Sequence, residues 1–335
     1  KKNTFISKKT YSWLRNTNVL FLEKRKLFYR ISIAITVVCI GSIAIRGFNY
    51  GIDFRGGRTY VVRFDQDIKV AEVGSALNAV FGETPEVKTF GGNNQVKITT
   101  EYKIEEISDK VDNEVETLLF EGLKESGLIG NITKQEFDTN YRQSSQKVGP
   151  TISDDIKKDA VIAIIFSLII IFLYILIRFR NWQYGLGATV ALAHDTMVVI
   201  GSFSLLHGLL PFSLEVDQSF IGAVLTIIGY SINDTVVIFD RIREYLHIHP
   251  KRPVEVNMNG AVNSTLRRTF STSLSVLIVL IAIFLFGGTS MKGFILALLV
   301  GVVSGTYSTV FIATPIVYDA QRWSERRKAK KNNKE

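Results

Sequence analysis

The sequence predicts a membrane protein in which an all-α bundle of six transmembrane helices carries an α+β, ferredoxin-like domain on its outer, periplasmic side. Three observations predict this fold class. Long apolar runs alternate with charged blocks along the 335 residues. One mixed interval, 46–159, separates the first apolar run from five others that follow at short spacing. Within that interval the residues follow the order β-α-β-β-α-β, which is typical of a split βαβ domain.

Each apolar run is long enough to cross a bilayer, which requires about 20 mostly apolar residues. The predicted membrane helices are 27–45, 160–177, 185–206, 220–239, 270–286 and 294–315. The predicted domains are a cytoplasmic segment 1–26, the first helix 27–45, the outer domain 46–159, five helices within 160–318 and a basic cytoplasmic tail 319–335.

The distribution of Lys and Arg in the short flanks predicts the orientation. These residues gather on one side, from Lys24 and Arg25 before the first helix to the tail 319–335, whereas the loop 208–217 has neither. Both termini are therefore predicted to be cytoplasmic, with the interval 46–159 in the periplasm of a cell with two membranes. This bias accounts for most of the net charge of +9, so no nucleic-acid partner is predicted.

The outer domain has the pattern of a small α+β fold. Its predicted elements are a strand at 58–64, a helix at 70–81, two strands at 86–90 and 95–100 around a Gly-Gly-Asn-Asn turn, a helix whose apolar stripe runs from Ile107 to Leu123, and an extended segment within 132–148. The domain has no metal-ligand cluster, no nucleophile–base pair and no phosphate-binding loop. The single cysteine, Cys39, excludes an intrachain disulfide. Neither an enzyme nor a cofactor is predicted.

Two polar residues, Asn233 and Asp234, lie within the predicted span 220–239. A carboxylate inside the hydrocarbon costs about 2.5–3.5 kcal/mol, which indicates a functional role. Arg268 is at the cytoplasmic mouth of the next span, and consecutive spans run antiparallel. The two residues could therefore meet and form an ion pair. Asp234 is interpreted either as one half of a static pair or as a group that exchanges protons.

His194 and Asp195 lie nine or ten residues into the span 185–206, which places them about 14 Å deep and close to the bilayer midplane. A histidine at this depth can simply hydrogen-bond a neighbouring helix. The functional alternative is that both residues belong to a proton pathway. The small residues Gly201 and Gly301-x-x-x-Gly305 are expected only to let helices approach closely.

The motif Gly51-Ile-Asp-Phe-Arg-Gly-Gly57 follows the first predicted span. Its glycines permit a tight turn where the chain leaves the membrane and enters a strand. A second interpretation makes Gly51, Asp53, Gly56 and Gly57 a hinge at the root of the outer domain. The two interpretations are compatible.

Several motifs, taken together, resemble the SecF branch of the SecD/SecF family of bacterial protein export. They occur in the family's order: GIDFRGG at 51–57, ALAHDT at 191–196, GYSINDTVVIFDRIRE at 229–244, NSTLRRT at 263–269 and GVVSGTYS at 301–308. The third motif is highly specific, whereas the first also suits SecD. The resemblance extends over nearly the whole chain.

The resemblance implies a resistance–nodulation–division (RND) type bundle in the bacterial inner membrane. The implied partners are SecD, the SecYEG channel, YajC and a translocating preprotein, with proton flow, or sodium in its place, as the driving force. Asp234 and Arg268 match the family's proton path. The chain is expected either as a separate subunit or as the SecF half of a fused SecD–SecF chain. A small-molecule or lipid exporter of the same superfamily and a passive scaffold stay open as alternatives, although no small-molecule substrate is expected.

Overall fold

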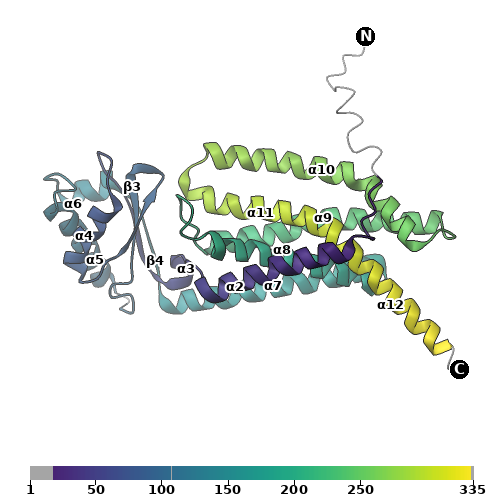
Figure 1. The fold of residues 1–335 in the computed structure, drawn as a ribbon. Coiled ribbons are helices and arrows are strands. Elements are labelled where there is room, and N and C mark those ends of the chain that lie inside the picture. The colour runs from purple at the N-terminus through teal and green to yellow at the C-terminus, as the bar shows by residue number, and fades with distance from the viewer. Residues whose placement is uncertain (1–17, 107, 333–335) are drawn as a thin grey trace, which may run out of the picture.

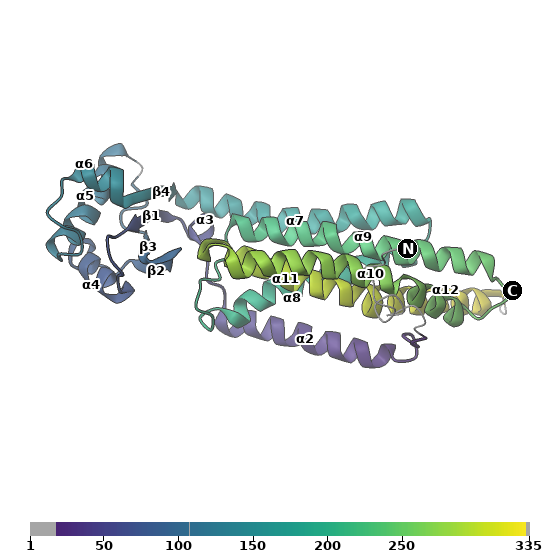
Figure 2. The same cartoon turned by 90° about the horizontal axis from the view of Figure 1, so that it is seen from above.

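The molecule is elongated, with a helical bundle at one end and an α+β domain at the other (Figure 1 and Figure 2). The structure, a computed structural model, describes residues 18–106 and 108–332. The N-terminal end of α2 (Arg25–Arg46) and helix α12 (Thr314–Asn332) both lie at the end of the bundle away from the α+β domain.

Six helical segments among the described residues are long and apolar enough to cross a membrane, which confirms the predicted number of spans. They are α2, α7 (Pro150–Phe179), α8 (Trp182–Leu206), α9 (Gln218–Ile248), α10 (Val254–Phe286) and the continuous segment Thr289–Asn332. Several of these helices are longer than the predicted apolar runs. Apolarity marks only the part that lipid covers, whereas the helical hydrogen bonds continue into the charged flanks.

The last segment contains the short 3-10 helix η2 (Thr289–Met291), α11 (Lys292–Ser308), the π turn η3 (Thr309–Ala313) and α12. Pro315 is the second residue after this π turn. A proline inside a helix removes one backbone hydrogen bond and crowds the carbonyl four residues earlier. The wider π turn therefore occurs where the α-helical ladder is weakest.

The α+β domain contains β1 (Gly57–Arg63), α4 (Val70–Phe81), β2 (Glu86–Phe90), β3 (Gly92–Thr100), α5 (Asp109–Glu125), the short helices α6 (Lys134–Glu136) and η1 (Phe137–Tyr141), and β4 (Arg142–Val148). The sheet order is β2-β3-β1-β4, and neighbouring strands are antiparallel. This is the ferredoxin-like topology that the sequence predicts. Of the predicted second helix, Ile107 lies outside the described residues.

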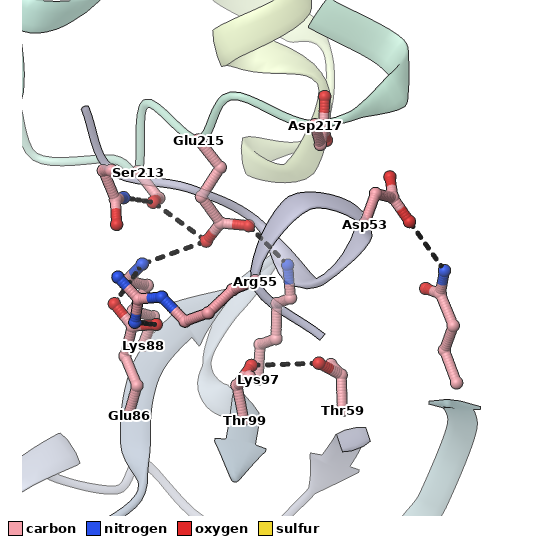
Figure 3. A network of polar contacts seen from close by, with 12 residues as sticks. Asp53, Arg55, Thr59, Glu86, Lys88, Lys97, Thr99, Ser213, Glu215 and Asp217 are labelled. Carbon is pink, nitrogen blue, oxygen red and sulfur yellow. Dashed lines mark hydrogen bonds and ion pairs between the residues drawn. The ribbon is translucent and has the colours of Figure 1, made fainter. Parts of the chain in front are cut away.

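One face of the sheet forms the core of the domain with α4 and α5. Buried residues from both layers include Val62, Val96, Ile98, Leu77 and Leu119. The alternate residues of the strands, among them Lys88 and Lys97, lie on the opposite face, which looks toward the bundle (Figure 3). This alternation follows from the two-residue period of a strand.

The domain is joined to α2 through a root that includes the short helix α3 (Ile52–Arg55). Tyr50 forms a parallel bridge with Val216, and the backbone N–H of Gly51 donates to the carbonyl of Val216 at 3.0 Å. Gly56 and Gly57 have φ values of 79° and 134°. A Cβ on Gly57 would also lie 2.9 Å from the carbonyl oxygen of Thr100. The turn therefore requires these glycines, and the hinge stays a prediction.

Helix α8 is the centre of the bundle, because α2, α7, α9, α11 and α12 all contact it. Small residues allow the closest contacts. A Cβ on Gly201 would lie 2.3 Å from the Cβ of Cys39 in α2, and a Cβ on Gly301 would lie 2.2 Å from Ile227 in α9. The predicted role of these glycines in close helix approach is confirmed.

Candidate functional site

The Asp195 carboxylate is the centre of a polar cluster inside the bundle. Asp195 is fully buried on α8. Three hydroxyl groups donate to it: Ser231 of α9 at 2.9 Å, Ser304 of α11 at 2.7 Å and Ser308 of α11 at 2.6 Å. An ionised carboxylate only accepts hydrogen bonds, so three hydroxyl donors complement it. We call these four residues the Asp195 cluster.

The small residues of α11 make the Asp195 cluster possible. Ser304 and Ser308 are four residues apart and therefore share one face of the helix. Gly305 lies between them, and a Cβ there would come within 2.9 Å of the Ser231 hydroxyl oxygen. Glycine at this position allows α9 to approach α11 closely enough for both helices to reach the same carboxylate.

A second polar contact lies one helical turn further along α9. The hydroxyl groups of Thr235 and Thr309 are 2.9 Å apart, and both residues are buried. Thr309 is also the first residue of the π turn η3. The irregular backbone of the last membrane segment therefore starts beside the Asp195 cluster. Single π turns within helices occur frequently at functional sites.

His194 is beside the Asp195 cluster but is poorly bonded. Its Nδ1 is 3.5 Å from Asp195 Oδ1, and its buried Nε2 has no hydrogen-bond partner among the described residues. Its ring packs against Tyr307, with ring centroids 6.2 Å apart. His194 also lines an apolar cavity of ≈460 Å³, between α8, α11 and Ile35 of α2. The structure brings His194 and Asp195 together, as the sequence predicts for neighbours on one helix.

Asp234 has a different environment from Asp195. Asp234 is only 5% exposed, yet no hydrogen bond or ion pair joins its carboxylate to any described residue. The charge of Arg268 acts on it through space. On α10, which packs against α9, the buried hydroxyl group of Thr269 also has no hydrogen-bond partner among the described residues. This region is therefore an under-satisfied polar site.

The predicted ion pair between Asp234 and Arg268 is wrong for this conformation, because no contact of 4.0 Å or less joins the two side chains. The reason is the helical period of α10. Its buried positions include Ala261, Thr265, Thr269 and Ser273, which mark the inward face. Arg268 is next to that face and is exposed in this chain. The prediction used only the depth of the two residues and ignored their angular positions.

Asn233 faces away from Asp234, toward the outside of the chain. Apart from its first residue, Gln218, the exposed positions in the first half of α9 are Ser219, Gly222, Thr226, Gly229 and Asn233. They recur every three or four residues and therefore form one stripe, which we call the α9 stripe. No heavy atom lies within 4 Å of a Cβ built on Gly222 or Gly229, so the stripe is open. Small and polar residues on a membrane helix favour contact with another helix.

The serine and threonine partners are not evident from the sequence. Ser231 lies within the motif at 229–244, and Ser304 and Ser308 lie within the motif at 301–308. The signal was the four-residue spacing of the two serines in an apolar helix. Serines in membrane helices commonly bond to their own backbone, so spacing alone does not show that they point at a carboxylate.

The fold and the site together define a multi-pass membrane protein with carboxylates buried at the centre of its bundle. Two family models match the sequence. One, described as protein export membrane protein SecD/SecF, C-terminal, matches residues 129–323, and the other, described as the SecD/SecF GG motif, matches residues 41–68. The chain belongs to the SecD/SecF family, within its SecF branch.

Curated relatives agree with this assignment. The protein translocase subunit SecF of Rhodothermus marinus is 41% identical over 307 residues, which are 91% of this chain and 94% of that protein. The SecF of Sebaldella termitidis is 34% identical over 318 residues, with 93% and 95% covered. The protein translocase subunit SecDF of Thermus thermophilus is 32% identical over 96% of this chain but only 41% of its own length.

Solved structures show the same fold. The crystal structure of SecDF, described as a translocon-associated membrane protein, from Thermus thermophilus matches with a TM-score of 0.75 and 29% identity over 92% of this chain. A SecDF structure in a super-membrane-facing form matches with a TM-score of 0.66 and 30% identity over 96% of this chain. The present chain spans about two fifths of each of these SecDF chains, 40% and 41% respectively.

Proposed function

We propose that this chain is the SecF-type subunit of the Sec protein-export machinery. With SecD it uses the proton motive force to promote translocation and release of preproteins on the outer face of the membrane. The observation that carries the proposal is the near full-length similarity to the Rhodothermus marinus protein, which is named protein translocase subunit SecF. The buried carboxylate of Asp234, which has no hydrogen bond or ion pair to a described residue, supports the ion-coupled part of the proposal.

The proposed coupling uses two charge states of Asp234. A buried carboxylate that has no hydrogen bond to lose can change its charge without breaking an internal network. Arg268 supplies a nearby positive charge that favours the ionised state. One elementary charge moved across the membrane potential provides about 2.3 kcal/mol per 100 mV. That energy can bias two conformations whose free energies differ by a few kcal/mol.

The other polar residues of the bundle would complete the path. We place Asn233 at the outer surface of the chain, next to Asp234 in the sequence, and His194 and Asp195 at the bundle centre, where three serine hydroxyl groups orient Asp195. Protons are the proposed coupling ion, and sodium is the alternative. No further cofactor, no nucleic acid and no small-molecule substrate is part of the proposal.

The α9 stripe supports SecD as the direct partner. An exposed Asn233 and two open glycines would be poorly placed against lipid tails alone, whereas a second helix could pack closely there and bond to the amide. The SecDF chains are more than twice as long as the matched part, which leaves room for such a partner half. SecYEG, YajC and the preprotein are the further proposed partners.

The proposed location is the bacterial inner membrane, with both termini cytoplasmic and the α+β domain in the periplasm. The bias of Lys and Arg toward the end of the bundle opposite that domain supports this orientation. At the root of the domain, Gly51, Asp53, Gly56 and Gly57 are the proposed pivot, because paired glycines accept backbone changes that other residues resist.

The test is an export assay in inverted membrane vesicles that contain this chain and its SecD partner. Asp234→Asn keeps the side-chain shape and removes the charge. We expect normal insertion but loss of the proton-dependent stimulation. The matched control is Asp154→Asn, which neutralises an exposed carboxylate on α7 that is paired with Lys157. Full stimulation in the Asp234→Asn variant would refute the proposal, and stimulation that follows a sodium gradient would identify sodium as the coupling ion.

A further inference from the structure

The α+β domain holds the outer end of helix α9 in two places, and Glu215 is the first (Figure 3). Glu215 lies three residues before the first residue of α9. Lys97 Nζ of β3 is 2.7 Å from its Oε2, and Lys88 Nζ of β2 is 3.0 Å from its Oε1. Lys88 and Lys97 are directly opposite each other in the sheet. The hydroxyl of Ser213 also donates to Glu215 Oε1 at 3.0 Å.

This ion-pair group is largely removed from water. The side chain of Glu215 is 13% exposed, and those of Lys88 and Lys97 are 24% and 21% exposed. Burial opposes ionisation of Glu215, but the charges and hydrogen bonds of Lys97 and Lys88 outweigh it and lower the pKa of Glu215 to about 2. The group therefore differs from surface ion pairs, which contribute little.

Asp53 is the second place of contact. Its Oδ2 accepts a hydrogen bond from the backbone N–H of Gln218, the first residue of α9, at 3.0 Å. Its Oδ1 accepts from Gln146 Nε2 of β4 at 3.3 Å. A carboxylate at this position also interacts favourably with the positive end of the helix dipole. Asp53 therefore joins the sheet of the domain to the N-terminus of α9.

Helix α9 then runs without a break from Gln218 past Asp234. The two residues are separated by about 24 Å of continuous helix at about 1.5 Å per residue. The covalent route from the domain to the bundle is different, because it passes through α3 to α2 and through β4 to α7. Among the described residues, the polar contacts of Glu215 and Asp53 are thus a direct link between the domain and the helix that carries Asp234.

We propose that Glu215 and Asp53 are positioning residues that transmit a displacement of α9 to the α+β domain. This inference rests on the proposed function, in which a change of charge at Asp234 moves α9. Asp53 contacts the first residue of α9 directly, and Glu215 lies three residues before that residue. A shift or a rotation of this rigid helix therefore reaches the domain through contacts at its very end. The backbone dihedral angles of the Gly56–Gly57 turn then change to accommodate this displacement, because the turn lies in the covalent connection between the domain and α2.

The experiment measures the distance between the domain and the bundle in the complex with the partner subunit. Spin labels are attached at Glu121→Cys on the exposed side of α5 and at Ile45→Cys, which is 87% exposed at the outer end of α2. A Cys39→Ser background removes the native thiol. Distance distributions are compared with and without Asp234→Asn, first with the intact contacts and then in the Glu215→Gln/Asp53→Asn double variant.

We expect Asp234→Asn to shift the distance distribution when both contacts are present and to leave it unchanged in the double variant. Export in the double variant should fall about tenfold, as expected for the loss of an ordinary coupling free energy. Glu114→Gln is the matched control, since it removes a carboxylate paired with Lys103 at 2.7 Å within the domain itself. A Glu215→Lys/Lys88→Glu/Lys97→Glu exchange tests whether restored pairing restores the shift.

Two outcomes would overturn the inference. One is an equal shift with and without the contacts, and the other is a domain that does not move in response to Asp234→Asn although that variant has lost export. In the second case the proposed function would still stand, because export would still depend on Asp234. If the double variant is absent from membranes, the charge-exchange variant tests the inference instead. A distance shift in response to Asp234→Asn in that variant requires the ion pairs and not only a folded chain.

Discussion

Asp195 and Asp234 are carboxylates buried in the same bundle, on the packed helices α8 and α9, but they have opposite surroundings. Asp195 accepts hydrogen bonds from three serine hydroxyl groups. Asp234 has no hydrogen bond or ion pair within the described residues, although Ser231, a partner of Asp195, lies only one turn before it. Burial alone therefore does not determine what a membrane carboxylate does, because the number of donors around it differs.

This difference in hydrogen bonding indicates different roles for Asp195 and Asp234. Three donors fix the position of Asp195 and join α8, α9 and α11 through one group, so Asp195 organises the bundle centre. Asp234 has little internal bonding to lose when it changes its charge or its position. Fully satisfied polar networks rigidify a core, whereas partly satisfied ones are costly and mark functional sites.

The largest expected effect is that of Asp195→Ala on stability. It leaves three buried hydroxyl groups without their acceptor, so the free energy of unfolding should fall by about 3–5 kcal/mol. Equilibrium unfolding in detergent measures this. Asp195→Asn is the control, because its amide can bond to hydroxyl groups that rotate, and the loss should be smaller. A loss below about 1 kcal/mol for the alanine variant would end the distinction between the two carboxylates.

Glu215, a buried carboxylate outside the membrane-spanning helices, can be compared with Asp195 and Asp234 through the pH dependence of its ion pairs. The pKa of Glu215 is lowered to about 2 from a usual value of 4.5. Its stabilisation of domain docking is therefore present above pH 4.5 and is lost as the pH falls from 4.5 toward 2. The full effect is about 3 kcal/mol at about 1.36 kcal/mol per pKa unit.

The measurement is the label distance between domain and bundle at a series of pH values. Burial, and then the charges of Asp53 and Glu215, raise the pKa of Asp217. Its contribution is present at low pH and is lost as the pH rises, so it partly offsets that of Glu215. The Glu215→Gln variant separates the contributions of Glu215 and Asp217 to the pH dependence, because it removes the first. If the distance in this variant keeps the same dependence on pH between 4.5 and 2, lysine pairing at Glu215 is not what docks the domain.

Single serine substitutions should have an intermediate effect. Ser304→Ala or Ser308→Ala removes one donor from Asp195 and should cost about 1 kcal/mol of unfolding free energy each. The double substitution should cost more than the sum of the two, because the remaining donor cannot satisfy both carboxylate oxygens. Ser275→Ala is the control, since among the described residues that hydroxyl bonds only to the Ser271 carbonyl of its own helix. Strict additivity would show that the serines act independently.

Asp234→Asn should have the smallest effect on stability, although its effect on export is the largest. The substitution removes no internal hydrogen bond, so the unfolding free energy should change by less than about 1 kcal/mol. The same detergent assay that is applied to Asp195→Ala provides the measurement. A destabilisation as large as that of Asp195→Ala would show that Asp234 also holds the bundle together. Its lack of hydrogen bonds would then not indicate a role in ion coupling.

Local sequence patterns were sufficient to predict the main helices and strands of the molecule. The helix at 70–81 occurs with the predicted bounds, and the strand at 86–90 does as well. Strand β3 begins three residues earlier than predicted, at Gly92, because Gly91, with φ of 86°, turns the chain alone. These successes reflect short-range causes: alternation on a strand, a stripe on a helix and a glycine at a turn.

The sites were only partly predictable. The cost of a carboxylate in the hydrocarbon pointed to Asp234 and Asp195, because that cost depends on position along one segment. The pairing of Asp234 with Arg268 was wrong, since depth does not specify the side of the helix on which a residue lies. The Lys88–Glu215–Lys97 contact joins two residues of a sheet to a distant loop, and no local pattern indicates such a contact.

By itself the sequence determined the six spans, the ferredoxin-like order of the α+β domain and the two carboxylates within the spans, since hydrophobicity and periodicity act along the chain. Only the tertiary structure decided that Asp195 is fully bonded, that Asp234 is not, and that the domain grips the end of α9. These properties depend on the angular positions and spacing of helices. Close contacts at Gly201, Gly301 and Gly305 set that spacing, between residues far apart in the sequence.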